Sequence, residues 1–294
     1  MGIFRLEGII EVMPNKLRKT INELFADLKN DPKMRIVFVE GNRDLAFWRE
    51  IVPLHERKDT VIYSISVIEI KVETGGERGR LFHLANIVND SEFCLRIRFF
   101  ADADCDRLLE RKILANVTLT DGRDLESYTL SESCFEKLWL TGMAGTAGDD
   151  KKLLSSVIKL AKPIGILRVV SEKYHKDLPL QRVFEKGWKR FLTGNRFERK
   201  LDLKKLMRTL LQLKHNSLRE YDELNQTFNV EQVYFNKFDS NQIIHGKDLI
   251  GILEVLIGIE RKLVETMLYL SLNYDEVRCY PNIRQVSNWI TTLK

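Results

Sequence analysis

Short apolar runs that alternate with segments of helical spacing constrain the fold of this chain more than any other feature. Four runs have the length and composition of strands buried in a sheet, at residues 35–39, 61–67, 95–100 and 116–120. Around them, apolar residues recur at helical intervals over residues 15–30, 43–52 and 80–89. This alternation predicts an α/β fold with a mainly parallel sheet and right-handed crossovers.

The second half of the chain follows a different pattern. Three segments fit amphipathic helices, at residues 180–192, 198–214 and 247–272, and we expect no strand among them. Glycines predict a loop at Gly75, Gly76 and Gly79 and a flexible junction at Gly142, Gly145 and Gly148. We therefore predict a Rossmann-like α/β domain over residues 1–148 and a helical, basic domain over residues 149–294.

Composition is that of a soluble globular protein, with 44% hydrophobic and 30% charged residues. The four cysteines form no C-x-x-C pair, which predicts reduced thiols in the cytoplasm and excludes a disulfide framework or a zinc ribbon. Residues 249–272 contain five charged side chains, so we interpret this apolar stretch as a buried helix and expect no membrane partner. We also expect no secretory signal, because the N-terminus lacks a sustained apolar segment.

Charge is distributed unevenly along the chain. Residues 151–220 hold 19 basic and 6 acidic side chains, a net charge of +13, whereas the other residues hold 28 basic and 36 acidic ones, a net charge of −8. A basic segment beside an acidic one suggests a polyanionic partner held near a cation site. The alternative is a helical region whose lysines and arginines are simply solvated.

Acidic residues follow two of the predicted strands. Glu40 ends the first run, and Asp44 lies four residues later; Asp102, Asp104 and Asp106 follow the third run. The carboxyl ends of parallel strands meet at one edge of a sheet, and Asp102 and Asp104, two apart on an extended segment, are expected to share a face that Asp106 continues. Converging carboxylates repel one another unless a cation neutralises them, and oxygen ligands favour Mg²⁺ or Mn²⁺. Such a site suits phosphodiester chemistry.

The alternative interpretation is structural. Aspartates often cap helices and fill turns, and an E-G-x-x-D or a D-x-D motif is common by itself. The two motifs together, each directly after an apolar run and about sixty residues apart, favour the metal site.

The sequences at residues 39–44 (VEGNRD) and 100–106 (FADADCD) resemble the TOPRIM signature, and the resemblance covers about residues 35–135. It implies that Asp102 and Asp104 bind the metal with Glu40, and that Glu40 can alternatively act as the general base. It also implies that Asp44 supports a second metal ion and that Asp106 is an outer ligand.

Two further segments resemble small TOPRIM-like proteins related to OLD nucleases. Residues 120–128 are similar to their S-x-E-N-Y stretch, which implies that Glu126 is a metal ligand, although Ser127 stands where asparagine is usual. Residues 244–249 (IHGKDL) are similar to another short segment, which implies that Lys247 stabilises a phosphate and that His245 transfers a proton. The alternatives are a carboxylate favoured by a helix N-terminus and an ordinary first helical turn.

The chain contains neither a zinc ribbon nor a G-x-x-x-x-G-K-[ST] loop of its own. A TOPRIM-like chain of this size resembles the AriB family, the effectors of PARIS anti-phage systems. That resemblance implies a toxic, Mg²⁺-dependent nuclease of abortive infection, restrained and released by a separate ABC-type ATPase, which as a homodimer cleaves host tRNA or other structured RNA. A DNA endonuclease of OLD type and a non-catalytic interaction subunit are the alternatives.

Cations and aromatic residues are interleaved between residues 182 and 208. The candidate contacts for nucleic-acid phosphates are Lys186, Lys189, Arg190, Arg196, Arg199, Lys200, Lys204 and Lys205. We expect Trp188 and Phe191 to pack inward rather than to stack on bases.

Overall fold

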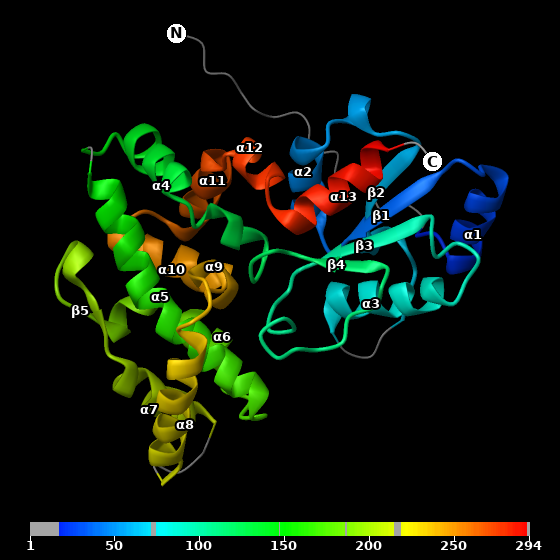
Figure 1. Cartoon of the computed structure of the whole chain (residues 1–294). Helices are drawn as coiled ribbons and strands as arrows, with labels where there is room; N and C mark the ends of the chain where they lie inside the picture. Colours follow the sequence, from blue (N-terminus) through cyan, green and yellow to red (C-terminus); the bar gives the residue numbers. More distant parts are fainter. Residues whose placement is uncertain (1–17, 72–74, 147, 186, 215–218, 293–294) are drawn as a thin grey trace.

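Four parallel strands form the central sheet in the first half of the chain (Figure 1). The computed structural model describes residues 18–71, 75–146, 148–185, 187–214 and 219–292. The strands are β1 (Arg35–Val39), β2 (Thr60–Ser64), β3 (Ile97–Ala101) and β4 (Val117–Leu119). The predicted α/β class and parallel sheet are therefore confirmed. The bounds of β1 are as predicted, and the ends of the other three strands are shifted by one to three residues.

The strand order β2-β1-β3-β4 creates a switch point between β1 and β3. From β1 the chain moves outward to β2 and then returns past β1 to form β3 on the other side. Ligands bind at such points in open parallel sheets, beyond the carboxyl ends of the strands. Val39 pairs with Phe100 in the register of β1 and β3, so Glu40 and Asp102 follow on adjacent strands.

Helices cover both faces of the sheet. The strands alternate, so Ile36 and Phe38 belong to one apolar cluster, while Val37 and Val39 belong to another. The first face is covered by α1 (Ile21–Asn30) and α3 (Gly76–Asn89), and the second by α2 (Asn42–Ile51) and the C-terminal helix α13 (Pro281–Thr291).

The N-terminal ends of two of these helices differ from the prediction. α1 begins at Ile21, because Thr20 and Glu23 form a capping box; residues 15–17 of the expected helix lie outside the described residues. α3 begins at Gly76, inside the segment predicted as a loop, after Gly75 adopts a left-handed conformation with φ of 90°. Gly76 and Gly79, which were predicted as loop, therefore belong to the helix, which begins four residues earlier than the predicted residue 80.

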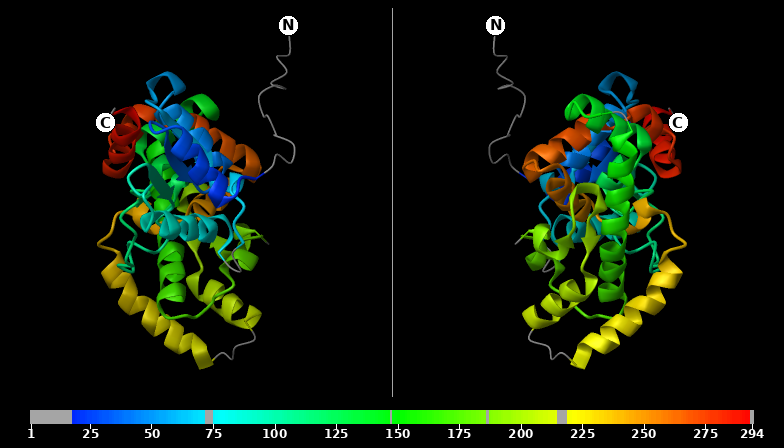
Figure 2. Two further views of the ribbon diagram at one scale, coloured as in Figure 1. Left: turned by 90° about the vertical axis from the view of Figure 1, so that its right-hand side faces the viewer. Right: turned by 90° about the vertical axis from the view of Figure 1, so that its left-hand side faces the viewer.

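The second half of the chain is assembled around α5 (Asp149–Lys173), which packs against α4 (Glu132–Lys137), α8 (Arg219–Phe235) and α10 (Gly246–Ile257) (Figures 1 and 2). Its apolar core is separate from the two clusters of the sheet. The remaining short elements are η1 (Leu54–Glu56), η2 (Ile65–Val67), η3 (Leu125–Thr129), η4 (Leu138–Gly142), η6 (Arg196–Glu198) and α9 (Ser240–Ile243). The predicted helical region is thus confirmed.

Three expectations about this half are wrong in detail. The segment 180–192 divides into α6 (Leu180–Glu185) and the short helix η5 (Trp188–Phe191). The expectation of no strand fails, because β5 (Leu192–Thr193) and β6 (Lys200–Leu201) form a small antiparallel pair before α7 (Leu203–Leu213). The segment 247–272 forms two helices, because α10 ends at Gly258 in the left-handed region, and α11 (Arg261–Ser271) follows.

The C-terminal helices return to the sheet. α12 (Tyr274–Arg278) contacts α2, and α13 contributes Ile283, Val286 and Ile290 to the apolar cluster on its face of the sheet. The Arg35 side chain donates to the carbonyl of Thr292 at 2.6 Å, and its guanidinium lies 3.8 Å from the centre of the Trp289 ring. The domain boundary at residue 148 stays a prediction. Helices from both sides of this boundary cover the faces of the sheet.

No helix in the described part of the chain is long and apolar enough to span a lipid bilayer.

The packing of α13 on the sheet predicts a large loss of stability when its buried side chains are shortened. Ile283 is fully buried, so Ile283→Ala should lower the free energy of unfolding by about 2–4 kcal/mol. Leu54 is 79% exposed, and Leu54→Ala should change it by less than about 0.5 kcal/mol. Urea unfolding measures both, and similar values for the two variants would contradict this account of α13.

Candidate functional site

Five carboxylates gather where β1 and β3 end, and we call this group the carboxylate cluster. Glu40 follows β1, Asp102 follows β3, Asp44 lies in the first turn of α2, and Asp124 and Glu126 lie at the start of η3 after β4. Burial raises the pKa of Asp102 well above its usual range, and the negative charges of the other four residues raise it further. The switch point of the sheet therefore carries a dense negative charge.

Backbone N–H groups orient four of these carboxylates, of which Glu40, Asp102 and Asp44 lie beside β1 and β3. Glu40 Oε1 accepts a hydrogen bond from the N–H of Asp102 at 3.1 Å, and Asp102 Oδ1 accepts one from Leu125 at 3.1 Å. Asp44 Oδ2 accepts one from Gly41 at 3.0 Å, which also caps α2. Glu40 Oε2 and Asp102 Oδ2 make no hydrogen bond to any described residue, which leaves these two oxygens available to a ligand.

Burial changes the acidity of the cluster. Burial, aided by the charges of Asp44 and Asp104 and opposed by Arg78, raises the pKa of Glu40 to about 7. Burial likewise raises the pKa of Asp44 to about 6. With pKa values raised by burial, these carboxylates change protonation within the physiological range. Such behaviour is typical of groups that bind a cation or transfer a proton.

Arg78 of α3 faces the other aspartates that the sequence singled out. Its guanidinium donates to Glu40 Oε1 at 3.0 Å, to Asp106 Oδ2 at 2.5 Å and to the carbonyl of Asp102, and its Nε lies 3.4 Å from Asp104 Oδ2. Arg111 binds the other oxygen of Asp106 at 3.1 Å. Asp106 is therefore held between two guanidinium groups.

The expected single row of aspartates is wrong. β3 ends at Ala101, and Asp104 adopts a left-handed conformation with φ of 46°, so the segment after Asp102 turns instead of remaining extended. Asp104 and Asp106 consequently meet Arg78, while Asp102 meets the backbone of η3. Strained backbone of this kind is concentrated at functional sites.

The N-terminus of α10 closes another side of the cluster. Asp124 Oδ2 accepts the N–H of Gly246 at 2.6 Å, and His245 Nδ1 lies 3.5 Å from the same oxygen. His245 Nδ1 also accepts the N–H of Lys247, so the neutral ring carries its proton on Nε2. Burial, followed by Arg168 and Arg123, lowers the pKa of His245 well below its usual range.

Glu126 and Gly246 are in close contact. A Cβ atom at Gly246 would lie 2.4 Å from the Cβ of Glu126, so this approach requires glycine. Glu126 also lies 3.7 Å from a nitrogen of Arg43. The structure thus brings Glu126 and His245 to the cluster, while Lys247, the next residue of α10, has an exposed side chain.

Buried Arg123 joins the site to the helical half, and half-buried Arg168 binds α10 to α5 within that half. Arg123 donates to the carbonyl of Ile243 at 2.7 Å and to that of Gly165 in α5 at 3.2 Å. Arg168 of α5 binds both oxygens of Asp248 in α10, each at 2.7 Å. These contacts fix the first turn of α10 against η3, and hence fix Gly246 and His245 beside Asp124.

Asp124 and Arg78 are the site residues that the sequence did not identify. Asp124 carried only a weak signal, because it lies five residues after the end of β4, whereas Glu40 and Asp102 directly follow their strands. Arg78 carried none, because its contacts depend on how α3 lies against β1 and β3.

The fit of the cluster to a metal ion can be judged from its donors. Within the described ranges, no three histidine, cysteine or acidic side chains are grouped as a ready metal site. The donors are nevertheless all carboxylate oxygens, two of them without a hydrogen bond, beside buried like charges. That chemistry suits a hard cation such as Mg²⁺ or Mn²⁺.

The candidate phosphate-binding residues lie around the β5–β6 pair and the start of α7. The exposed ones are Lys189, Arg190, Arg196, Lys200, Lys204 and Lys205; Arg199 is half-buried, and Lys186 lies outside the described residues. Trp188 and Phe191 are buried, which confirms that they pack inward. This surface can therefore offer cations, but not these two rings, to a nucleic acid.

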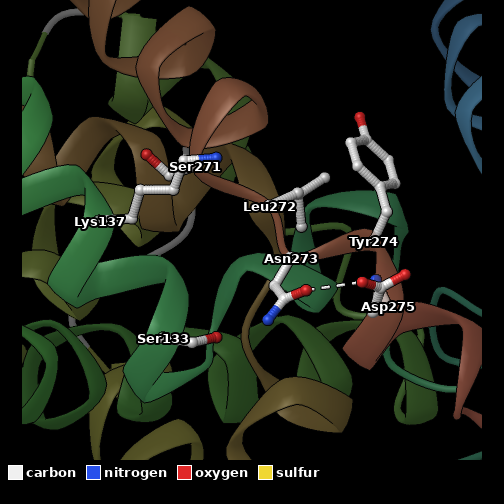
Figure 3. Close-up of a pocket in the computed structure, with 7 residues that line it drawn as sticks. All are labelled: Ser133, Lys137, Ser271, Leu272, Asn273, Tyr274 and Asp275. Atoms are coloured by element: carbon white, nitrogen blue, oxygen red, sulfur yellow. Dashed lines mark hydrogen bonds between the residues drawn. The ribbon is translucent and has the colours of Figure 1, made fainter.

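A shallow pocket lies between α4, the end of α11 and the start of α12 (Figure 3). Its seven lining residues are Ser133, Lys137, Ser271, Leu272, Asn273, Tyr274 and Asp275. None of them belongs to the carboxylate cluster, and the bond from the Asp275 N–H to Asn273 Oδ1 caps α12. The pocket therefore shares no residue with the carboxylate cluster.

No protein-family model and no curated protein matches this chain.

The raised pKa values predict an unusual dependence of stability on pH. Glu40 and Asp44 keep their protons up to about pH 7 and 6 when folded, but lose them at lower pH when unfolded, starting from ordinary values of 4.5 and 3.8. The folded state then binds more protons, so stability should fall as pH rises from about 5 to about 7. In EDTA, the Tm should drop by several degrees across this window.

Glu40→Gln should flatten that slope, whereas Glu56→Gln, at an exposed position, should retain it. Added Mg²⁺ should raise the Tm more at pH 8 than at pH 5, because metal ligands must be deprotonated. Identical slopes for wild type and Glu40→Gln would contradict the assignment.

Proposed function

We propose that this chain is a TOPRIM-type nuclease that hydrolyses phosphodiester bonds with a divalent cation. The observation that supports it most is the carboxylate cluster at the switch point of a parallel sheet, with free oxygens on Glu40 and Asp102. Metal-dependent phosphodiester chemistry requires such a set of oriented, buried oxygen donors.

In this proposal Glu40 and Asp102 hold Mg²⁺ or Mn²⁺, with Asp44 and Glu126 nearby. The bound ion would polarise the phosphate and acidify the attacking water. Glu40, with a pKa of about 7, is suited to accept a proton from that water if it acts as the base. The Nε2–H of His245 and the exposed ammonium group of Lys247 are donors for the phosphate oxygens.

The substrate class rests on the basic surface and on the resemblance to AriB-type effectors. Cations around β5, β6 and α7 would bind a phosphate backbone without reading its sequence. We favour structured RNA such as tRNA over DNA. The proposal includes an anti-phage role in the cytoplasm, an active homodimer, and an ABC-type ATPase that restrains the chain until it is released.

The nuclease proposal predicts that activity depends on Glu40 and Asp102. Purified wild-type protein should cleave a tRNA pool, or less favourably plasmid DNA, when Mg²⁺ is present. Glu40→Gln and Asp102→Asn should each reduce the rate by about 100-fold or more, because each removes a ligand or base. Asp222→Asn, at an exposed position on α8, is the matched control and should retain activity.

Gel electrophoresis with and without EDTA follows the reaction. If wild-type protein leaves both nucleic acids intact with Mg²⁺ and Mn²⁺, and if its expression leaves cellular RNA and DNA as intact as Glu40→Gln does, the chain is a non-catalytic module. Cleavage of DNA alone would select the OLD-type alternative.

The basic surface predicts salt-dependent binding. In a Glu40→Gln background, which prevents cleavage, Lys204→Glu with Lys205→Glu should weaken RNA binding and reduce the slope of log affinity against log salt by roughly two. Lys29→Glu with Lys33→Glu changes the same charge at exposed positions at and after the end of α1 and should have little effect. Fluorescence anisotropy at several salt concentrations measures both, and equal slopes would remove the assignment.

A further inference from the structure

Arg78 places a positively charged guanidinium group beside the carboxylate cluster. We propose that Arg78 takes the place of a second metal ion, so that the site binds one divalent cation on the Asp102 side and Arg78 itself contacts the phosphate of the substrate. This inference rests on the proposed function, and it adds the number of ions and a further catalytic residue.

The first support is the balance of charge across the site. Asp104 and Asp106 face Arg78, which also binds Glu40, and Asp106 is also bound by Arg111, which also binds Glu172. Each of the two aspartates thus has a guanidinium partner. A divalent ion could enter there only by displacing a guanidinium group. The two arginines therefore already supply the positive charge on the side of the site that holds Asp104 and Asp106.

On the other side, no cationic side chain among the described residues binds the Asp102 carboxylate, although Arg123 acts on Asp124. The charges that act most strongly on Asp102 are those of Glu40, Asp124, Asp44 and Glu126, all negative. Arg43 is the cation near Glu126, and it also pairs with Glu265. A divalent ion is therefore needed beside Asp102 and not beside Asp106.

The second support is the seating of Arg78. Its side chain is 23% exposed, and its guanidinium carbon lies 4.8 Å from the centre of the Phe82 ring, one turn further along α3. A surface arginine would sample many rotamers, whereas this one is held by four polar groups and an aromatic ring. Arg78 is thus fixed in position before a substrate arrives.

The third support is a spare donor. A guanidinium group has five N–H bonds. Nη1 donates to Glu40 and to the Asp102 carbonyl, Nε faces Asp104, and Nη2 uses one N–H for Asp106. The second N–H of Nη2 has no partner among the described residues, and it can bind a phosphate oxygen. A lysine has three donors and no planar fork, and so could not make all these contacts.

Metal stoichiometry provides the test that does not depend on activity. Isothermal titration with Mn²⁺ should show one ion per wild-type chain. Arg78→Gln should bind a second ion, because Asp104 loses its guanidinium partner and Asp106 keeps only Arg111. Arg111→Gln is the matched control, since Arg111 also binds Asp106 but does not reach Glu40, and it should still bind one ion.

The outcomes separate this inference from the proposed function. Two ions in wild type, or one in a folded Arg78→Gln protein, would overturn the role of Arg78 and leave the nuclease proposal standing. No Mn²⁺ binding by wild type would overturn both. If Arg78→Gln fails to fold, Asp106→Asn replaces it: its Mn²⁺ affinity should stay within about twofold of wild type, whereas Asp102→Asn should lose about 100-fold.

The proposed contact between Arg78 and the substrate is tested separately, by measuring the cleavage rate. Arg78→Ala should lower the cleavage rate by about 100-fold, as expected for loss of one donor to the transition state. Methylguanidine should restore part of the rate in Arg78→Ala and should not affect Asp102→Asn. A wild-type rate in Arg78→Ala, or a loss that methylguanidine leaves unchanged, would overturn the catalytic contact.

Discussion

Repulsion between buried carboxylates is the constraint around which this molecule is built. Parallel strands deliver Glu40 and Asp102 to neighbouring positions, and the loop after β4 adds Asp124 and Glu126. Burial and mutual repulsion both oppose the charged forms, so the surrounding structure must hold these groups in place. Backbone N–H groups do so for several oxygens, and Arg78 compensates one side.

The helical half contributes directly to this arrangement. The N–H of Gly246 binds Asp124, and the absence of a Cβ atom lets α10 approach Glu126. Arg123, from the loop before η3, binds carbonyls of Gly165 and Ile243 in the helical half. A change in how α10 lies against η3 would therefore move two of the five carboxylates.

The sequence allowed prediction of what local pattern determines. Apolar runs gave four parallel strands, and their acidic ends located Glu40 and Asp102 at one edge, because parallel pairing leaves few alternatives. The row through Asp104 and Asp106 was wrong, since a left-handed residue turned the chain after β3. Gly258, which divides the predicted helix 247–272, was a local signal that we did not use.

Arg78 and α13 could not have been predicted in this way. The role of Arg78 depends on four partners that lie 24 to 38 residues away in the sequence. The amphipathic pattern of α13 indicates a buried face, but it does not say which surface that face covers. Both depend on tertiary packing, which a single sequence does not reveal.

The late position of α13 has a consequence for synthesis on the ribosome. The sheet receives its first three helices early, but the apolar face over Val37 and Phe100, which α2 covers in part, is fully covered only when residues 281–291 emerge. A nascent or truncated chain thus exposes an apolar surface that chaperones and proteases recognise. For a protein proposed to damage nucleic acids, this order of folding would delay a working enzyme until its translation is nearly finished and its partner can meet it.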